Sequence, residues 1–140
     1  MGTDFREKHS PDAVVEPDLE KALKKVVKDG TLACAVAFAL AEESGYSPAD
    51  IGKATDVLGF RLAKCQMGLF GYKPNKKIIK PASIVEPDLE AAIKEQTREG
   101  RIPCFACWDI AKRLHISKMS VSSACETLEI RIKPCQLGAF

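Results

Sequence analysis

The sequence predicts a mainly α-helical protein with small β-hairpins, built as two tandem units that are related by a 70-residue repeat. Two motifs anchor the repeat. Val-Glu-Pro-Asp-Leu-Glu at 15–20 returns at 85–90, and Cys-Gln-Met-Gly-Leu-Phe at 65–70 returns as Cys-Gln-Leu-Gly-Ala-Phe at 135–140. About a third of the aligned positions are identical, and the alignment needs no gap. We therefore expect one duplicated unit, with the same small fold in each copy.

The repeat divides the chain into a flexible tail at 1–13, repeat 1 at 14–71, a basic linker at 72–83 and repeat 2 at 84–140. The tail is polar and has no apolar period, and the linker carries lysines among prolines. A unit of about 60 residues buries only a modest part of its surface. We therefore expect the two repeats to pack against each other or against a second chain.

Each repeat is expected to begin with a helix. Glu-Pro-Asp at 16–18 suits a first turn, because proline loses no hydrogen bond there and the helix dipole favours acidic side chains. Apolar residues then recur at helical spacing. We expect Asp-Gly at 29–30 to end this helix through a left-handed glycine cap, and Gly100 to do the same in repeat 2.

Two further helices and a hairpin are expected to complete each repeat. Residues 60–65 and 130–135 alternate apolar and basic side chains, which is typical of strands. A turn at Gly68 and a return strand at Leu69-Phe70 would close the first hairpin. The remaining elements are expected at 31–33 and 101–103 (short extended segments), 34–44 and 104–114 (second helices), and 48–58 and 118–128 (third helices). This order predicts a winged-helix arrangement.

Residues 110–128 resemble the helix-turn-helix of bacterial and archaeal DNA-binding transcription regulators. The turn of that motif needs a residue that tolerates positive φ, which is Gly45 in repeat 1 and His115 in repeat 2. Ser47 and Ser117 follow as natural N-caps of the next helix. The resemblance implies two tandem winged helix-turn-helix units and a function in DNA binding and transcription regulation.

Repeat 2 carries the side chains that are expected to contact double-stranded DNA. The front of a recognition helix meets base edges in the major groove, which favours base contacts by Ser117, Lys118, Ser120, Ser122 and Ser123. Phosphate contacts are expected from Lys112, Arg113, Arg131 and Lys133, the last two on the predicted wing.

Repeat 1 differs from repeat 2 in its charge and in its third helix. That helix is expected to expose Asp50, Lys53 and Asp56, a poor surface for phosphate. Residues 1–70 carry a net charge of −2 and residues 71–140 a net charge of +4, so an anionic partner would meet the second half first. We expect repeat 1 to serve packing, homodimerisation or a partner protein.

The six cysteines leave a second interpretation open. Cys104 and Cys107 have the spacing of a metal or redox pair, and a ligand set of Cys104, Cys107, Cys125 and Cys135 is possible in repeat 2. Cysteine also serves as a small buried apolar residue, and the alignment of Cys107 and Cys125 with small or uncharged residues of repeat 1 favours that role. A cysteine-based metal or thiol sensor and a winged-helix protein-interaction module without DNA binding are thus the alternatives to a DNA-binding protein.

The sequence has no pattern typical of an enzyme, a cofactor site or a membrane protein. The two histidines lie outside any catalytic motif, and no glycine-rich phosphate loop is present. No apolar run approaches the roughly 20 residues that a membrane span needs. The first residues contain no apolar stretch of the kind found in signal peptides, so a cytoplasmic location is expected.

Overall fold

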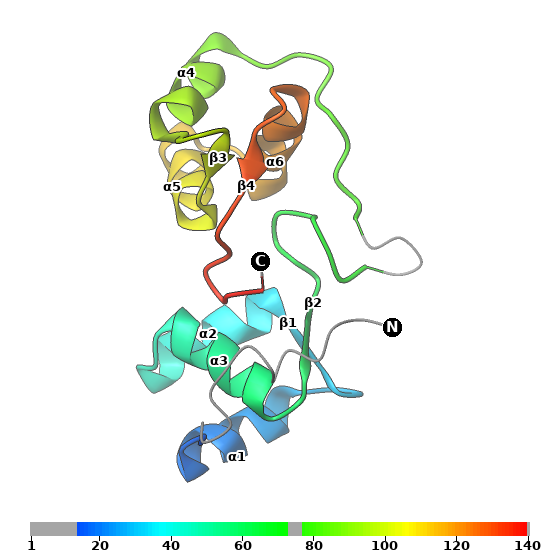
Figure 1. Cartoon of the computed structure of the whole chain (residues 1–140), viewed down its shortest axis with the longest axis vertical. Helices are drawn as coiled ribbons and strands as arrows, with labels where there is room; N and C mark the ends of the chain where they lie inside the picture. Colours follow the sequence, from blue (N-terminus) through cyan, green and yellow to red (C-terminus); the bar gives the residue numbers. More distant parts are fainter. Residues whose placement is uncertain (1–13, 73–76, 140) are drawn as a thin grey trace. The chain divides into compact units, whose positions relative to one another are not determined.

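The chain forms two compact units, Met1–Cys65 and Gln66–Phe140. The computed structural model describes residues 14–72 and 77–139, so the predicted tail at 1–13 lies outside the described residues. The described chain is mainly helical, with six α-helices and four short strands (Figure 1). Residues 66–71, which end repeat 1 in the sequence, lie with the second unit.

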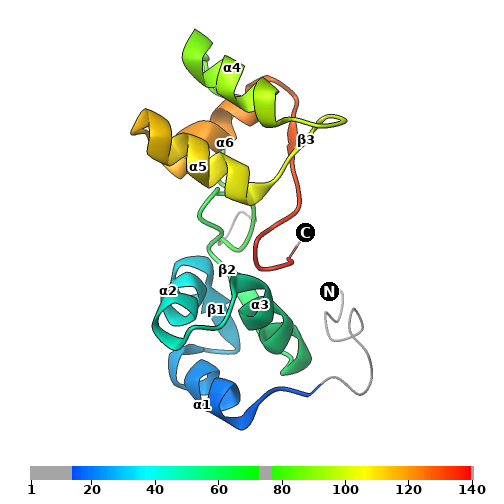
Figure 2. The same ribbon diagram turned by 90° about the vertical axis from the view of Figure 1, so that its left-hand side faces the viewer.

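The same order of elements occurs in both units. The first contains α1 (Pro17–Val26), β1 (Thr31–Ala33), α2 (Cys34–Ser44), α3 (Pro48–Val57) and β2 (Arg61–Ala63). The second contains α4 (Pro87–Gln96), β3 (Arg101–Ile102), α5 (Cys104–Leu114), α6 (Lys118–Thr127) and β4 (Arg131–Ile132). The bounds expected for the second helices are confirmed, and the third helices end one residue earlier than expected. In the second unit all three helices pack against one another (Figure 2).

The first helix of each unit has one buried side and one charged side. Leu19 and Leu23 of α1 are buried, as are Leu89 and Ile93 of α4. On the outer side, glutamate and lysine pair four residues apart, at 3.0 Å in α1 and 2.8 Å in α4. Each of these exposed pairs contributes only about 0.3–0.5 kcal/mol, so burial of the apolar stripe holds the helix in place.

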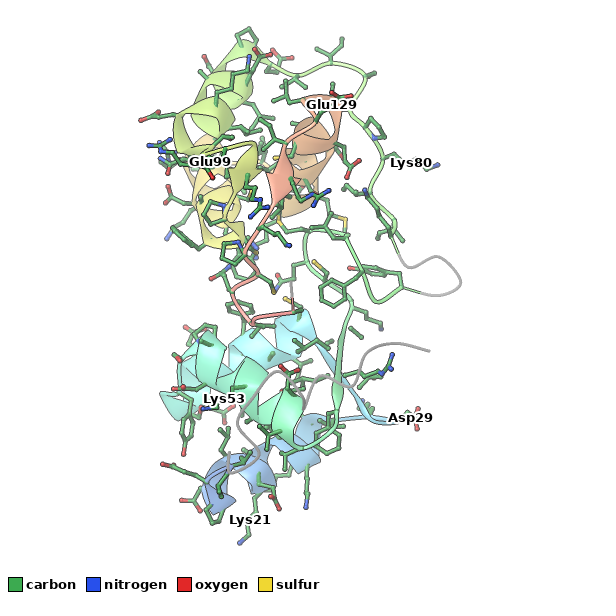
Figure 3. All side chains as sticks on the ribbon, in the orientation of Figure 1. Lys21, Asp29, Lys53, Lys80, Glu99 and Glu129 are labelled. Atoms are coloured by element: carbon green, nitrogen blue, oxygen red, sulfur yellow. The ribbon has the colours of Figure 1, made fainter. Side chains whose placement is uncertain are left out.

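A tight turn, rather than a helix cap, occupies residues 29–30. Helix α1 already ends at Val26, and Lys28 pairs with Thr31 across the turn through two backbone hydrogen bonds of 2.9 Å. Both central residues have positive φ, 52° and 74°, as in the two-residue turns that suit β-hairpins. The expected left-handed cap is therefore wrong. Residues 99–100 form the same turn, and the labelled Asp29 and Glu99 mark the two positions in Figure 3.

The turn between the second and third helices has a left-handed backbone in both units. Gly45 adopts a φ of 83° and His115 a φ of 57°, each directly after the preceding helix. The side chains of Ser47 and Ser117 then cap α3 and α6, because each Oγ accepts a hydrogen bond from the backbone N–H three residues later, at 3.1 Å and 3.0 Å. The expected turn residues and both serine N-caps are confirmed.

The strand after the third helix pairs in parallel with the first strand of its own unit. The register joins Thr31 to Arg61 and Arg101 to Arg131. Leu69-Phe70 form no strand, so the expected hairpin is wrong there, and the end of the corresponding segment of repeat 2 lies outside the described residues. Parallel pairing needs a long crossover, and the two intervening helices provide it. An alternating segment can pair with any open strand edge, so its sequence pattern did not specify this partner.

The segment that follows repeat 1 is attached to α6 along part of its length. The backbone N–H of Ala82 donates to the carbonyl of Ser123 at 3.2 Å, and Thr127 Oγ1 donates to the carbonyl of Ala82 at 2.7 Å. Lys77 forms an ion pair with Glu126. The linker lysines among residues 77–80 are exposed as expected, but the segment is not detached from the fold. Among the described residues, no helix is long and apolar enough to cross a membrane.

Candidate nucleic-acid interface

The side chains expected to contact DNA lie in four places of the second unit. These are the last turn of α5 (Lys112, Arg113), the start of α6 (Ser117, Lys118, Ser120), the middle of α6 (Ser122, Ser123), and β4 with the residue that follows it (Arg131, Lys133). Lys112, Ser117 and Lys118 line one open groove. Ser122, Arg131 and Lys133 line another cavity. Ser117, Ser120 and Ser123 line a third groove. The structure therefore divides these residues among three sites and does not place them in one row along α6.

The start of α6 presents hydroxyl groups that already bond to one another. Ser117 Oγ accepts from the backbone N–H of Ser120, and the two side-chain oxygens lie 2.8 Å apart. Both side chains are exposed. Their first role is to satisfy the free N–H groups of the first helical turn.

Lys118 lies between an amide and an aromatic ring. Its Nζ donates to Gln66 Oε1 at 2.9 Å and stands 3.9 Å from the centroid of the Trp108 ring, which is a cation–π contact. Lys118 and Trp108 are half-buried. The expectation that Lys118 lies free on an exposed face is wrong, and Trp108 is a groove residue as well as a packing residue.

Ser122 is fully buried, with an exposed fraction of 0%. The expectation that it faces the major groove is therefore wrong. It shares one side of α6 with Cys125 and Glu126, which together with Leu69 and Phe70 line a cavity. The aligned residue of repeat 1, Gly52, is also buried.

Ser123 lies on a different side of α6, where residues 80–84 pass. It is half-buried, and its carbonyl accepts a hydrogen bond from the backbone N–H of Ala82. Lys80 is exposed, and its side chain points away from α6 (Figure 3). Ser123 is thus covered by the chain's own segment rather than open to a DNA groove.

The last turn of α5 places two cations in solvent. Lys112 and Arg113 are exposed, and Arg113 Nε lies 3.0 Å from Asp109 Oδ2, one turn earlier. Lys112 forms no ion pair with the described residues. Basic side chains at the C-terminal end of a helix interact favourably with the negative end of the helix dipole. Lys112 and Arg113 therefore also stabilise α5.

The β3–β4 pair carries a cluster of positive charge. Arg101 and Arg131 are register partners, and both are exposed. Arg98 pairs with Arg101 across the tight turn, and its Nη1 donates to the carbonyls of Glu95 and Thr97 at 2.8 Å and 2.9 Å. Lys133 follows β4 and is half-buried.

We call Arg98, Arg101, Arg131 and Lys133 the basic ribbon. Neither Arg101 nor Arg131 forms an ion pair with any residue in the described part of the chain. The sequence indicated only Arg131 and Lys133. Arg98 and Arg101 were missed because their meeting with β4 depends on parallel pairing. The repeat alignment held a signal, since Arg101 replaces Thr31.

The four cysteines considered as metal ligands do not assemble into a site. Across residues 14–72 and 77–139, no three or more His, Cys, Asp or Glu side chains are grouped so that they could hold a metal ion. All six cysteines are free thiols, and five are buried, with Cys135 half-buried. Cys107 on α5 and Cys125 on α6 are hydrogen-bonded to each other. This hydrogen bond, followed by burial, raises the pKa of the Cys107 thiol far above its ordinary value.

The third helix of the first unit has a different surface. Asp50 and Lys53 are exposed as expected, but Asp56 is buried, with 6% exposure, so the expectation for Asp56 is wrong. The labelled Lys53 points away from α3 (Figure 3). Nearby, Tyr46 Oη donates to a Glu16 carboxylate oxygen at 2.5 Å. This hydrogen bond, together with the negative charge on Glu16, raises the pKa of Tyr46.

No protein-family model, curated protein or solved structure matches the chain. Its function must be inferred from the geometry above. The basic ribbon offers guanidinium groups that suit phosphate oxygens, because arginine presents several N–H donors in a planar fork. The start of α6 offers the exposed hydroxyls of Ser117 and Ser120, and its cation, Lys118, is already bonded to Gln66. The second unit is therefore better suited to hold a phosphate backbone than to read base edges.

Proposed function

We propose that the chain is a DNA-binding protein and a transcription regulator whose second repeat makes the principal contacts. The main support for this proposal is that Arg101 and Arg131 lie opposite each other in the β3–β4 pair. Like charges on facing positions of paired strands repel one another, and no carboxylate of the described residues offsets this pair. A phosphate group placed between the two guanidiniums removes the repulsion and gains charge-assisted hydrogen bonds.

The contacts that we assign are mainly to the DNA backbone. The basic ribbon and Lys112 would hold phosphates, and Ser117 at the start of α6 lines the same groove as Lys112. Ser122 has no place in this interface because it is buried. Phosphate contacts position a protein on a duplex but carry no sequence information directly. We therefore expect modest sequence preference as long as the segment at 80–84 stays on α6.

A salt titration of the full chain with a fluorescent duplex tests the proposal. Neutralising each phosphate contributes a slope of about −0.9 to the plot of log affinity against log salt concentration. The double variant Arg101→Thr/Arg131→Ala should weaken binding and make the slope less steep by about one unit, because the two guanidiniums share one phosphate. For the single variant Arg131→Ala, the matched control is Arg61→Ala, because Arg61 occupies the position of Arg131 in the first unit and its loss should leave both quantities unchanged.

An unchanged slope in the double variant would exclude the basic ribbon as the DNA contact. An equal loss in Arg61→Ala would mean that the chain binds DNA through general positive charge and not through the second repeat.

One observation favours a second candidate, a protein-interaction module that does not bind DNA. Residues 77–84 already occupy one side of α6 through Ala82 and the Lys77–Glu126 pair. Because this side of α6 binds an extended segment of its own chain, it could also bind an extended peptide of another protein. This candidate predicts no measurable affinity for duplex even at low salt, so the same titration separates the two. For repeat 1 we propose homodimerisation or contact with a partner protein.

A further inference from the structure

A cavity of about 610 Å³ lies beside the C-terminal half of α6 in the second unit. Its walls come from α6, from β4, from the end of repeat 1 and from the segment that follows repeat 1. The lining residues include Phe70, Lys77, Ser122, Glu126, Arg131 and Lys133. A volume of this size is within the usual range for sites that bind small molecules.

One polar group in the wall of the cavity has no hydrogen-bond partner within the fold. Ser122 is fully buried, and its Oγ has no hydrogen-bond partner among the described residues. Buried hydroxyl groups in folded proteins are nearly always hydrogen-bonded. The hydroxyl is a donor as well as an acceptor, so it suits the oxygen of an anionic ligand.

The charge that remains available in the cavity is positive. Lys77 and Glu126 neutralise each other in an ion pair. Arg131 and Lys133 form no ion pair with the described residues, and Glu129 is the remaining carboxylate of the lining. Two cations thus face one carboxylate, which favours an anion at this position.

The rest of the lining is apolar. Leu69 and Phe70 come from the end of repeat 1, and Ile130 and Ile132 come from the end of the second unit. A ligand that fills this space needs an apolar or aromatic part next to its charged group. A bare inorganic ion would leave the apolar side unfilled.

The first unit lacks the polar half of this arrangement. Gly52 stands where Ser122 stands in the second unit, and Ala63 stands where Lys133 stands. Only Arg131 has an identical counterpart, Arg61. The polar groups therefore belong to repeat 2 and not to the scaffold that the two repeats share.

We propose that this cavity binds a small organic anion, a phosphate monoester or a carboxylate that carries an apolar or aromatic group. Ser122 and Arg131 contact the anionic group, Lys133 adds positive charge, and Phe70 packs on the apolar part. The site goes beyond DNA binding. It shares Arg131 and Lys133 with the basic ribbon, but Ser122 is buried and has no role in the DNA interface.

Calorimetric titration of the full chain with four probes tests the site in the absence of DNA. Phenyl phosphate and benzoate combine both features, inorganic phosphate lacks the apolar part, and benzyl alcohol lacks the charge. We expect saturable binding of phenyl phosphate or benzoate, at least about tenfold tighter than the other two probes. The better of the two aromatic anions identifies the anionic group. Equal binding of benzyl alcohol, or no saturable binding of any probe, would overturn the proposal.

Three variants locate the binding site. Arg131→Ala should weaken binding of the preferred probe by about tenfold or more, and Ser122→Ala by about two- to tenfold, which is the usual contribution of one hydrogen bond. Arg61→Ala, its counterpart in the first unit, should leave binding unchanged. An equal loss in Arg61→Ala would overturn the proposal.

Amide chemical-shift changes in the wild-type chain provide an independent readout that does not depend on how a variant folds. Shifts confined to 122–133, 69–72 and 77 support the site, and shifts centred on the first unit contradict it. Failure of these titrations leaves the DNA proposal standing, because that proposal is tested with duplex alone.

Discussion

Arg101 and Arg131 face each other as register partners in the parallel β3–β4 pair, whereas the first unit places Thr31 opposite Arg61. The two units thus share a strand pairing but differ in the charge that it carries. A facing pair of arginines is unfavourable in the isolated protein because the two charges repel. The same pair becomes favourable when an anion binds between the two side chains. The proposed function therefore lowers the folding stability of the unbound protein.

Arg101→Thr should stabilise the chain, because it gives the second unit the pair that the first unit already has. The expected gain in the free energy of unfolding is about 0.2–1 kcal/mol at low salt, and it should shrink as salt screens exposed charges. Urea unfolding at two salt concentrations measures both effects. The reciprocal control, Thr31→Arg, should destabilise the first unit. A loss of stability in Arg101→Thr would show that Arg101 makes a favourable contact in the folded chain.

His115→Gly should also stabilise the second unit. His115 has a φ of 57°, a left-handed conformation that costs a residue with a side chain roughly 1–2 kcal/mol and costs glycine almost nothing. Gly45→His should destabilise the first unit by a similar amount. A Cβ at Gly45 would meet no atom within 4 Å, so the effect is one of backbone conformation and not of a clash. Thermal unfolding of both variants measures the change, and equal melting temperatures would contradict it.

Tyr46 should ionise at higher pH than an ordinary tyrosine. Its pKa is raised because the hydroxyl donates to Glu16, a bond that exists only while Tyr46 is neutral. This contribution to stability is fully present below the unfolded-state pKa of about 10 and is lost as pH rises through the raised folded-state value. Absorbance at 295 nm follows the ionisation. Glu16→Gln should lower the midpoint towards 10, and Tyr46→Phe should remove the late phase. A late phase that persists in Tyr46→Phe would assign it to Tyr72.

Cysteine reactivity in the native chain should be graded by burial. Cys107 is fully buried, and its pKa is raised by the hydrogen bond to Cys125, so its thiol stays protonated at neutral pH. The thiolate is the reactive form. Alkylation at pH 7 should therefore label the half-buried Cys135 before Cys107, as mass spectrometry of peptides can show. In urea all six cysteines should react together. Rapid native labelling of Cys107 would contradict its burial.

Much of the fold could be predicted because its signals are local. The bounds of the second helices, the left-handed residues between helices and the serine caps of α3 and α6 each depend on residues within one or two turns. The ends of the first helices were predicted less well. A two-residue turn and a helix cap both favour glycine at positive φ, so the Asp29-Gly30 pair did not distinguish them.

The candidate site was predicted only in part. Arg131 and Lys133 were named, but Arg98 and Arg101 were not, because a hairpin would have paired β4 with a later segment. Ser122 was placed on the wrong side of α6, since a serine in a short helix with small residues on several sides gives little indication of which side is buried.

The sequence by itself determined the duplication, the helices and the residues that begin and end most of them. Only the tertiary structure decided that β3 and β4 pair in parallel, that residues 77–84 lie on α6 and that Ser122 faces a cavity. The physical reason is the distance along the chain over which each interaction acts. Capping and backbone preference act between neighbouring residues. The meeting of Arg101 with Arg131, 30 positions apart, depends on how the intervening helices pack.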